Sequence, residues 1–223
     1  MKVKAVIPIK MNNVRTPGKN TKPFSDGKPL IHLIQQKLLN CKHIDEVYVY
    51  CSNEEIKQFL LPGVKYYKRD EQFDTPQADV IEMMRVFSEN VDADIYVQAH
   101  ATTPFLTSES IDKALEQLQS DYYDSAFAVT KLQDFLWQND TPVNYDPKSI
   151  SRTQDMTPYF KETTGLYIFK KNVIQEMHRR IGIKPYLLEV SEIESLDIDE
   201  PEDFMIADAV YTYLKSNGDS QWI

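Results

Sequence analysis

The sequence has few of the features that mark exported, membrane-embedded or metal-binding proteins. Only two of its 223 residues are cysteines, Cys41 and Cys51, and both stand among apolar residues without the spacing of metal ligands. We therefore expect reduced, buried thiols and a cytoplasmic protein. No apolar run is long enough to cross a bilayer, and the short one at the N-terminus is too short for a signal peptide.

Positive charge is also scarce. The chain has 25 lysines and arginines against 34 aspartates and glutamates, a formal net charge of −9. Non-specific binding to nucleic acid or to an anionic membrane requires a basic surface, so both partners are excluded. An anionic ligand would instead need a local cluster of basic side chains. The length and the 42% hydrophobic content suit one α/β domain with a sizeable core.

Apolar strand-like runs alternate with amphipathic helical segments along most of the chain. Residues Lys2–Ile9 are nearly continuously apolar, as in a strand covered on both faces. Residues Pro29–Cys41 place their apolar side chains at helical spacing. The same reasoning predicts strands at 46–52, 64–69, 94–99, 124–130 and 164–169, and helices at 53–61, 75–90, 107–120, 172–180 and 201–214. Repeated βα units predict an α/β fold with an open, mostly parallel sheet and right-handed crossovers.

One region breaks this alternation. Residues 131–161 are rich in Asp, Asn, Pro and Thr and show no second apolar core. We interpret them as an insertion or flap that contacts substrate or a second subunit.

The loop after the first strand collects positive charge and turn residues. Around Pro17 and Gly18 it carries four basic side chains: Lys10, Arg15, Lys19 and Lys22. Ligands of open α/β sheets bind at the carboxyl ends of strands, where this loop lies. Basic side chains and a glycine turn suit phosphate, although an ordinary basic surface loop is an equal alternative. The patterns G-x-x-x-x-G-K-[ST] and G-x-G-x-x-G are absent, so neither a P-loop NTPase nor a dinucleotide site is indicated.

This loop resembles the nucleotide-binding loop of the CMP-N-acylneuraminate cytidylyltransferases, A-R-x-G-S-K-G-x-P-G-K-N. Residues 17–20 (P-G-K-N) match it outright, Lys10 stands where the family has arginine, and Asn13 stands where it has serine. Arg15 matches the form S-x-R-x-P-G-K of the related CMP-Kdo synthetases. The resemblance implies that the triphosphate of CTP is bound by five side chains, namely Lys10, Asn13, Arg15, Lys19 and Asn20. The three basic ones among them would hold the outer phosphates and the departing pyrophosphate.

A second segment, residues 68–84, is similar to the family's R-P-x-E-L-A-x-D pattern. Arg69, Glu71 and Asp74 are the matching residues. The resemblance implies that Arg69 and Asp74 lie beside the nucleotide. Thr75 is expected to cap the following helix whatever the function.

A third segment, residues 97–115, looks like the family's L-L-Q-P-T-S-P-L-R-T. Thr102 and Thr103 fit the pattern, whereas His100 replaces a sugar-contacting glutamine and Leu106 replaces an arginine. The resemblance implies that His100 and the two threonines contact the substrate, although a lone histidine at a strand end can equally be structural.

A fourth segment, residues 160–169, resembles the family's F-R-P-N-G-A-I-Y-I, with Lys161 in place of the arginine. Lys161 and the nearby Arg152 are candidates to pair with a carboxylate of the substrate.

The last segment, residues 194–204, closely matches S-I-D-I-D-T-x-x-D-L. In extended chain, Asp197 and Asp199 project to the same side, because residues two apart share a face. Together with triphosphate oxygens, such a pair suits Mg²⁺. As a structural alternative, Asp199 and Glu202 could form a capping box ahead of Pro201.

The resemblance covers most of the chain. It implies a single Rossmann-like nucleotidyltransferase domain over residues 1–223, with helices flanking the sheet. The implied reaction is Mg²⁺-dependent transfer of a cytidylyl group from CTP to an acidic α-keto sugar of the sialic acid or Kdo type. A homodimer is expected, with no nucleic-acid or membrane partner.

Three other functions remain open. One is a nucleotidyltransferase whose acceptor is a sugar phosphate or a phospho-alcohol. Another is a glycosyltransferase of similar fold, although the D-I-D sequence at 197–199 is then misplaced and the P-G-K-N loop is unexplained. The third is a non-catalytic nucleotide-binding protein on the same scaffold.

Overall fold

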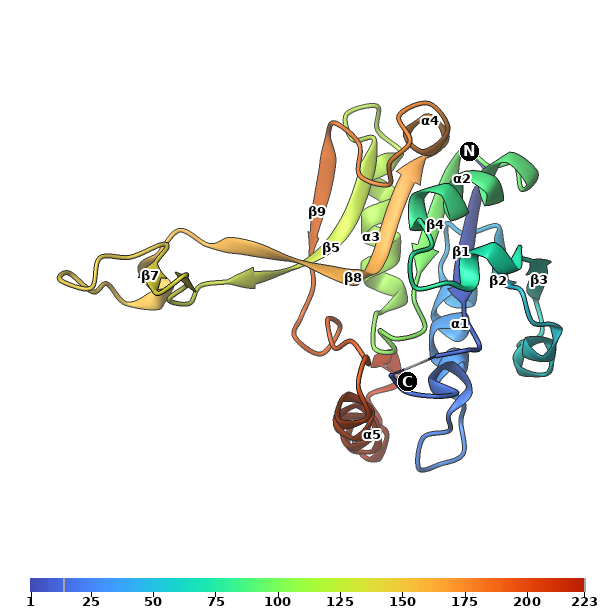
Figure 1. The fold of residues 1–223 in the computed structure, drawn as a ribbon, viewed down its shortest axis with the longest axis horizontal. Coiled ribbons are helices and arrows are strands. Elements are labelled where there is room, and N and C mark those ends of the chain that lie inside the picture. Colours follow the sequence, from blue (N-terminus) through green and yellow to red (C-terminus); the bar gives the residue numbers. More distant parts are fainter. Residues whose placement is uncertain (14, 223) are drawn as a thin grey trace.

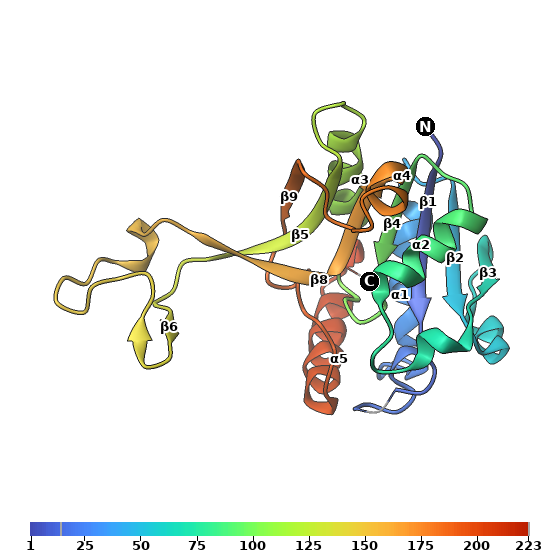
Figure 2. The ribbon, with the colours of Figure 1, turned by 45° about the horizontal axis from the view of Figure 1, so that its top comes forward.

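The computed structural model, which describes residues 1–13 and 15–222, contains a seven-stranded sheet with helices on both faces (Figures 1 and 2). The strands in chain order are β1 (Val3–Ile9), β2 (Glu46–Cys51), β3 (Val64–Lys68), β4 (Ile95–Ala99), β5 (Ser125–Leu132), β8 (Tyr159–Lys170) and β9 (Pro185–Glu189). Their spatial order is β3-β2-β1-β4-β8-β5-β9. Strand β8 is antiparallel to β4 and β5, whereas the other pairings are parallel. The prediction of a mostly parallel α/β sheet is confirmed.

Two pairs of helices cover the sheet. Buried side chains of α1 (Leu30–Asn40) and α3 (Ser108–Leu118) pack on one face, and those of α2 (Val80–Asn90) and α4 (Lys171–Gln175) pack on the other. The long helix α5 (Pro201–Ser216) joins a third apolar cluster with α1. Short 3-10 helices occupy Lys19–Thr21, Glu54–Phe59, Glu71–Asp74, Thr153–Asp155 and Ser220–Trp222. Among the described residues, no helix has both the length and the apolar character needed to cross a membrane.

The predicted start of α2 is wrong. The helix begins at Val80 rather than near Thr75, and the carboxylate of Asp79 caps it by accepting the N–H of Ile81 at 2.7 Å. The chain before it forms the 3-10 helix Glu71–Asp74, and Thr75 ends that turn instead of opening α2. A second aspartate, Asp70, caps the 3-10 helix by accepting the N–H of Gln72. Two aspartate caps thus divide a segment that the Thr-Pro pair suggested was one helix.

Two further elements differ from expectation. Helix α4 ends at Gln175, five residues before the predicted end, and β9 was not predicted at all. Strand β9 begins with Pro185 and lies at the edge of the sheet beside β5. Proline is tolerated at the first residue of an edge strand, because the missing N–H leaves no interior ladder bond broken. The proline at its first position is therefore why β9 was missed in the sequence.

Residues 131–161, here called the arm, project far from the body of the molecule (Figures 1 and 2). Its base is a continuation of β5 and β8, which still pair at Lys131↔Phe160 and Leu132↔Tyr159. Further out, the two-residue strands β6 (Trp137–Gln138) and β7 (Thr141–Pro142) pair with one another. Large apolar side chains on the arm are exposed, namely Phe135, Trp137, Val143, Ile150, Tyr159 and Phe160. The segment expected to be an insertion is thus a strand extension that carries an apolar surface.

The order of the strands creates a crevice beside β1. From β1 the chain proceeds outward to β2 and β3, and it then returns to place β4 on the other side of β1. Ligands of open α/β sheets bind at such a reversal, outside the carboxyl ends of the strands. Lys10 directly follows β1 and His100 directly follows β4, so both residues stand at this crevice.

Candidate functional site

A pocket of about 240 Å³ lies at the crevice beside β1 and β4. An adjoining hollow of about 430 Å³ shares three of its lining residues, Lys10, Asn13 and Lys19, and also includes Arg15. The pocket additionally contains other residues singled out from the sequence, namely Asn20, Arg69, His100 and Thr102. Side chains from three separate sequence segments therefore meet in one place.

The first loop is anchored by Lys19, which is only 8% exposed. Its Nζ donates to the carbonyl oxygen of Ile198 at 2.6 Å and lies 3.2 Å from Asp199 Oδ1. Gly18 adopts a φ of 67° directly before the 3-10 turn, a left-handed conformation that glycine takes without a steric penalty. Asn20 Nδ2 donates to the carbonyl oxygen of Lys10 at 3.0 Å and so holds the start of the loop.

Arg15 makes a more exposed contact with the same acidic segment. Its Nη2 lies 2.8 Å from Asp199 Oδ1, and its Nη1 lies 3.4 Å from Glu200 Oε1. The Arg15 side chain is 58% exposed, so these pairs stabilise the fold by only about 0–1 kcal/mol. An anionic ligand could therefore draw Arg15 away at little cost.

The two aspartates predicted as a pair lie next to the site without lining the pocket. Between them, Ile198 is fully buried, and its N–H donates to the carbonyl oxygen of Thr102 at 2.9 Å. Asp197 Oδ2 accepts from Thr164 Oγ1 at 2.7 Å, while Asp197 Oδ1 is buried without a partner among the described residues. Burial of Ile198 thus fixes the segment, with Asp199 bonded to Lys19 and Arg15 of the first loop and Asp197 bonded to Thr164 of β8.

The capping box predicted for this segment lies one residue further along. Glu200 and Asp203 form it, not Asp199 and Glu202, because Pro201 is the first residue of α5 and the residue before it becomes the cap. Asp199 therefore has no capping role, and its side chain faces Lys19 and Arg15 instead.

The donors at this edge suit a magnesium ion that arrives with a nucleotide. Within residues 1–13 and 15–222, no group of three or more His, Cys, Asp or Glu side chains forms a complete metal site. Mg²⁺, however, usually uses one or two carboxylates and completes its shell with water and substrate phosphates. The unpaired Oδ1 of Asp197, with Asp199 two residues away, fits that donor set.

Arg69 is a buried cation at the wall of the pocket, with 3% exposure. It forms an ion pair with Asp74, whose Oδ2 accepts from Ser52 Oγ at 2.6 Å. Arg69 Nε is buried and has no partner in the described part of the chain. The guanidinium is thus fixed on one side and retains an unsatisfied donor.

His100 is held in its neutral form. Its pKa is lowered to about 4, first by burial and then by the positive charges of Arg180 and Lys19, while Asp197 opposes the shift. Its Nε2 lies 2.8 Å from Gln98 Nε2, so with this amide orientation the ring nitrogen accepts and the ring proton resides on Nδ1.

A close approach of backbone holds the turn after β4 in place. The N–H of His100 donates to the carbonyl oxygen of Gly165 at 3.0 Å, and Thr103 Oγ1 donates to the carbonyl oxygen of His100 at 3.1 Å. A Cβ on Gly165 would lie 2.6 Å from Thr103 Oγ1, so only glycine permits this contact.

Unsatisfied buried polar atoms gather at this site. In the described residues, four buried side-chain atoms lack a hydrogen-bond partner, namely Asn13 Oδ1, Arg69 Nε, Gln98 Oε1 and Asp197 Oδ1. Asn13 and Arg69 line the pocket, Gln98 bonds its lining residue His100, and Asp197 precedes Ile198, whose N–H bonds the lining residue Thr102. A buried group left unpaired costs about 1–3 kcal/mol, so such atoms are normally satisfied by a ligand, an ion or water. The crevice is therefore built for a polar ligand.

Some predicted residues lie elsewhere. Arg152 and Lys161 are both exposed on the arm, and Arg152 Nε bonds Asp155 Oδ2 at 2.8 Å. The structure does not bring either residue into the pocket of its own chain. Leu106 is 1% exposed and belongs to the apolar core, so this departure from the family pattern does not shape the pocket.

Three residues near the site were not identified from the sequence. Gln98 is a polar residue within an otherwise apolar strand, a signal that could have drawn attention to it. Thr164 lies within the fourth recognised segment without being singled out there, and the fold brings it to Asp197. Arg180 lies outside every recognised motif, and its charge lowers the pKa of His100.

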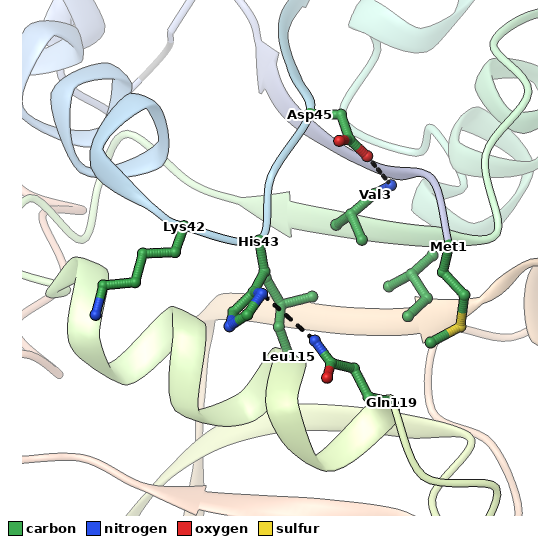
Figure 3. Close-up of a pocket in the computed structure, with 8 residues that line it drawn as sticks. Met1, Val3, Lys42, His43, Asp45, Leu115 and Gln119 are labelled. Carbon is green, nitrogen blue, oxygen red and sulfur yellow. Dashed lines mark hydrogen bonds between the residues drawn. The ribbon is translucent and has the colours of Figure 1, made fainter.

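A larger hollow of about 510 Å³ lies at the opposite edge of the sheet, by the first residues of β1 and β4 (Figure 3). Its polar groups already bond one another: Asp45 Oδ2 accepts the N–H of Val3 at 2.7 Å, and Gln119 Nε2 lies 3.4 Å from His43 Nδ1. The unsatisfied atoms are at the crevice, which is therefore the better candidate.

Comparison with known proteins is consistent with a functional site at the crevice beside β1 and β4. A sequence model of the family described as Cytidylyltransferase matches residues 5–216. The chain is 27% identical over 216 residues to N-acylneuraminate cytidylyltransferase A of Danio rerio, covering 92% of this chain and 50% of that protein. It is 24% identical over 264 residues to 3-deoxy-manno-octulosonate cytidylyltransferase of Pelobacter propionicus, covering 97% of this chain and all of that protein. The chain thus spans about half the length of the fish relative.

Solved structures show the same fold. A CMP:2-keto-3-deoxy-manno-octonic acid synthetase complexed with CTP superposes with a TM-score of 0.74 at 18% identity, covering 96% of this chain and 99% of that one. A 4-diphosphocytidyl-2C-methyl-D-erythritol synthase from Anaerococcus prevotii gives a TM-score of 0.68 at 14% identity, covering 95% and 96%.

The depressed pKa of His100 predicts a specific dependence of stability on pH. Above pH 6.5, His100 is neutral in both the folded and the unfolded chain. Between pH 6.5 and about 4, the unfolded chain takes up a proton at this residue and the folded chain does not. Stability should therefore fall on acidification, by about 2 kcal/mol at pH 4.5. Urea unfolding at pH 7.5 and 4.5 should show a smaller loss for His100→Gln than for the wild type. Equal losses in both proteins would contradict the buried neutral state.

Proposed function

Because this chain belongs to the cytidylyltransferase family, we propose that it transfers a cytidylyl group from CTP to an acidic α-keto sugar. The products would be a CMP-sugar and pyrophosphate. The named substrates of the relatives, an acylneuraminate and a deoxy-manno-octulosonate, support this class of acceptor. The observation that carries the proposal is the meeting of a basic loop, an aspartate pair and four unsatisfied polar atoms at one crevice.

The first loop would bind the triphosphate. Lys10, Arg15 and Lys19 border one continuous hollow, as residues holding the outer phosphates should. The exposed Arg15 now contacts Asp199, so phosphate oxygens would replace this carboxylate as its partner. Lys19 would keep its bond to the carbonyl oxygen of Ile198 and add a phosphate oxygen. Asn20 acts indirectly, because its amide holds the carbonyl oxygen of Lys10.

The remaining nucleotide contacts would come from Arg69, after β3, and from Asn13 of the first loop. Arg69 Nε offers a donor and Asn13 Oδ1 an acceptor, and both atoms are buried and unpaired within the described residues. Asp74 and Ser52 fix the Arg69 guanidinium, so Asp74 positions the cation for the nucleotide.

Asp197 and Asp199 would hold Mg²⁺ together with the phosphates. When bound, the ion would neutralise phosphate charge and polarise the α-phosphoryl group. Thr164 donates to Asp197 Oδ2 and so turns the other carboxylate oxygen toward the ligand.

The transfer itself requires little covalent chemistry from the protein. The anomeric hydroxyl oxygen of the sugar forms a bond to the α-phosphorus as the bond from that phosphorus to the bridging oxygen breaks. Pyrophosphate leaves with that oxygen, and the hydroxyl proton passes to solvent. The protein aligns the two reactants and compensates negative charge with Lys10, Arg15 and Lys19.

The acceptor would lie beside His100, Thr102 and Thr103. The neutral ring of His100 can donate one hydrogen bond from Nδ1 without adding charge. We also propose a homodimer that covers the exposed apolar surface of the arm. Arg152 and Lys161 would reach an acceptor only across such an interface, because both are exposed on the arm and neither lines the pocket of its own chain.

A substrate panel tests the proposed reaction. We expect pyrophosphate release from CTP, in preference to ATP, GTP and UTP, with eight- or nine-carbon keto acid sugars. N-acetylneuraminic acid itself should be a poorer acceptor than a relative, because His100 replaces the family's glutamine. Release only with sugar phosphates or phospho-alcohols would reject the keto acid assignment. Nucleotide binding without turnover of any acceptor would indicate a binding protein.

Substitutions in the loop test the triphosphate contacts. Arg15→Ala and Lys19→Ala should weaken CTP binding roughly 10-fold, with a much smaller effect on CMP, which lacks the outer phosphates. Calorimetry with both nucleotides measures this difference. Lys22→Ala is the matched control, since Lys22 belongs to the same loop but stacks on Phe204 at 4.0 Å. Equal losses for CTP and CMP would place Arg15 and Lys19 away from the outer phosphates.

A substitution at the aspartate pair tests the metal. Asp197→Asn preserves the shape and the bond from Thr164 but removes a charged oxygen ligand, so the Mg²⁺ concentration for half-maximal rate should rise at least about 10-fold. The exposed Glu202 lies nearby in the sequence, and Glu202→Gln should leave that concentration unchanged. Normal turnover by Asp197→Asn at limiting Mg²⁺ would assign the pair a purely structural role.

A further inference from the structure

An unassigned basic side chain, Arg180, lies over the ring of Tyr167 in β8. It follows α4, and its guanidinium carbon stands 3.6 Å from the centroid of the Tyr167 ring. Tyr167 belongs to β8 and is fully buried. In the register of the antiparallel β4–β8 pair, Tyr167 is directly opposite Gln98.

This register connects Arg180 with His100. Residues directly opposite in an antiparallel pair share one face of the sheet, so the side chains of Tyr167 and Gln98 are neighbours. The amide of Gln98 in turn reaches the ring of His100 at 2.8 Å. Tyr167, Gln98 and His100 thus form a continuous patch, and Arg180 stands over one end of it. The effect of the Arg180 charge on the pKa of His100 agrees with this closeness.

The guanidinium of Arg180 has no ion pair and no hydrogen bond within residues 1–13 and 15–222. The nearby carboxylate of Glu162 is engaged with the hydroxyl of Tyr167. Stacking on a ring uses only the flat face of a guanidinium and leaves its N–H groups in the plane available. Arg180 is therefore a half-buried cation with donors to offer, near the unpaired acceptor Gln98 Oε1.

We propose that Arg180 recognises the acidic sugar by binding its carboxylate, with Tyr167 holding the guanidinium in position beside His100. This inference rests on the proposed function and adds a residue that determines specificity for the acceptor. A guanidinium matches the two oxygens of a carboxylate with two parallel hydrogen bonds, which a lysine cannot reproduce. The contact lies within one chain, unlike any contribution from Arg152 or Lys161.

Kinetics on three variants of the full chain test the proposal. Arg180→Gln should raise KM for the acidic acceptor roughly 10- to 100-fold, the loss expected for a charge-assisted pair, while KM for CTP and the melting temperature change little. Arg180→Lys keeps the charge and should be intermediate. Arg179→Gln is the matched control, because it removes the same charge from the neighbouring, exposed residue, and it should resemble the wild type.

A second comparison separates recognition from a structural role. The wild type should prefer the acid to the carboxamide of the same sugar, and Arg180→Gln should lose most of this preference. An Arg180→Gln enzyme that keeps both its KM and its preference overturns the inference while the proposed function stands. A wild type that uses only sugar phosphates or phospho-alcohols overturns both, since no acceptor carboxylate is then recognised.

Discussion

The site depends on the burial of one ammonium group between two distant parts of the chain. Lys19 is almost enclosed, and a buried charge is costly unless hydrogen bonds and an opposite charge compensate it. The carbonyl oxygen of Ile198 and the carboxylate of Asp199 provide both. This contact sets the first loop against the segment that precedes α5. The basic side chains and the aspartate pair lie next to one crevice because this contact holds their two segments together.

Strand β8 supports the site from the other side with three consecutive contacts. Thr164 bonds Asp197, Gly165 admits Thr103 and accepts from His100, and Tyr167 lies opposite Gln98. The same strand begins in the exposed arm and ends in the buried sheet. Because it is antiparallel to β4, its residues approach the turn after β4 from the direction opposite to that of the other strands. One end of β8 therefore lies in the arm, and the other end supports the pocket.

Sequence patterns predicted the architecture where local signals agreed with tertiary structure. The period of the apolar residues predicted β1, β4 and the helices α1 and α3. The same pattern misplaced the start of α2, where Asp79 caps the helix although the earlier Thr-Pro pair had suggested a start there. It also missed β9, because this edge strand begins with Pro185. Four of the residues singled out by the motifs line one pocket, namely Lys10, Lys19, Arg69 and His100. Arg180 could not be found in this way, because its position depends on the register of β4 with β8 and on the short length of α4.

The contact of Lys19 with Ile198 joins residues that are 179 positions apart. A chain leaving the ribosome exposes its first strand and loop long before the segment that completes them. Contacts of such long range form late, since the entropy of closing the intervening chain must be overcome first. A nascent chain stalled before residue 198 would have most of its sheet and no ordered phosphate loop. The arrangement of the crevice would then appear only after residues 198 and 199 have joined the fold, so the integrity of the site reports on that late closure.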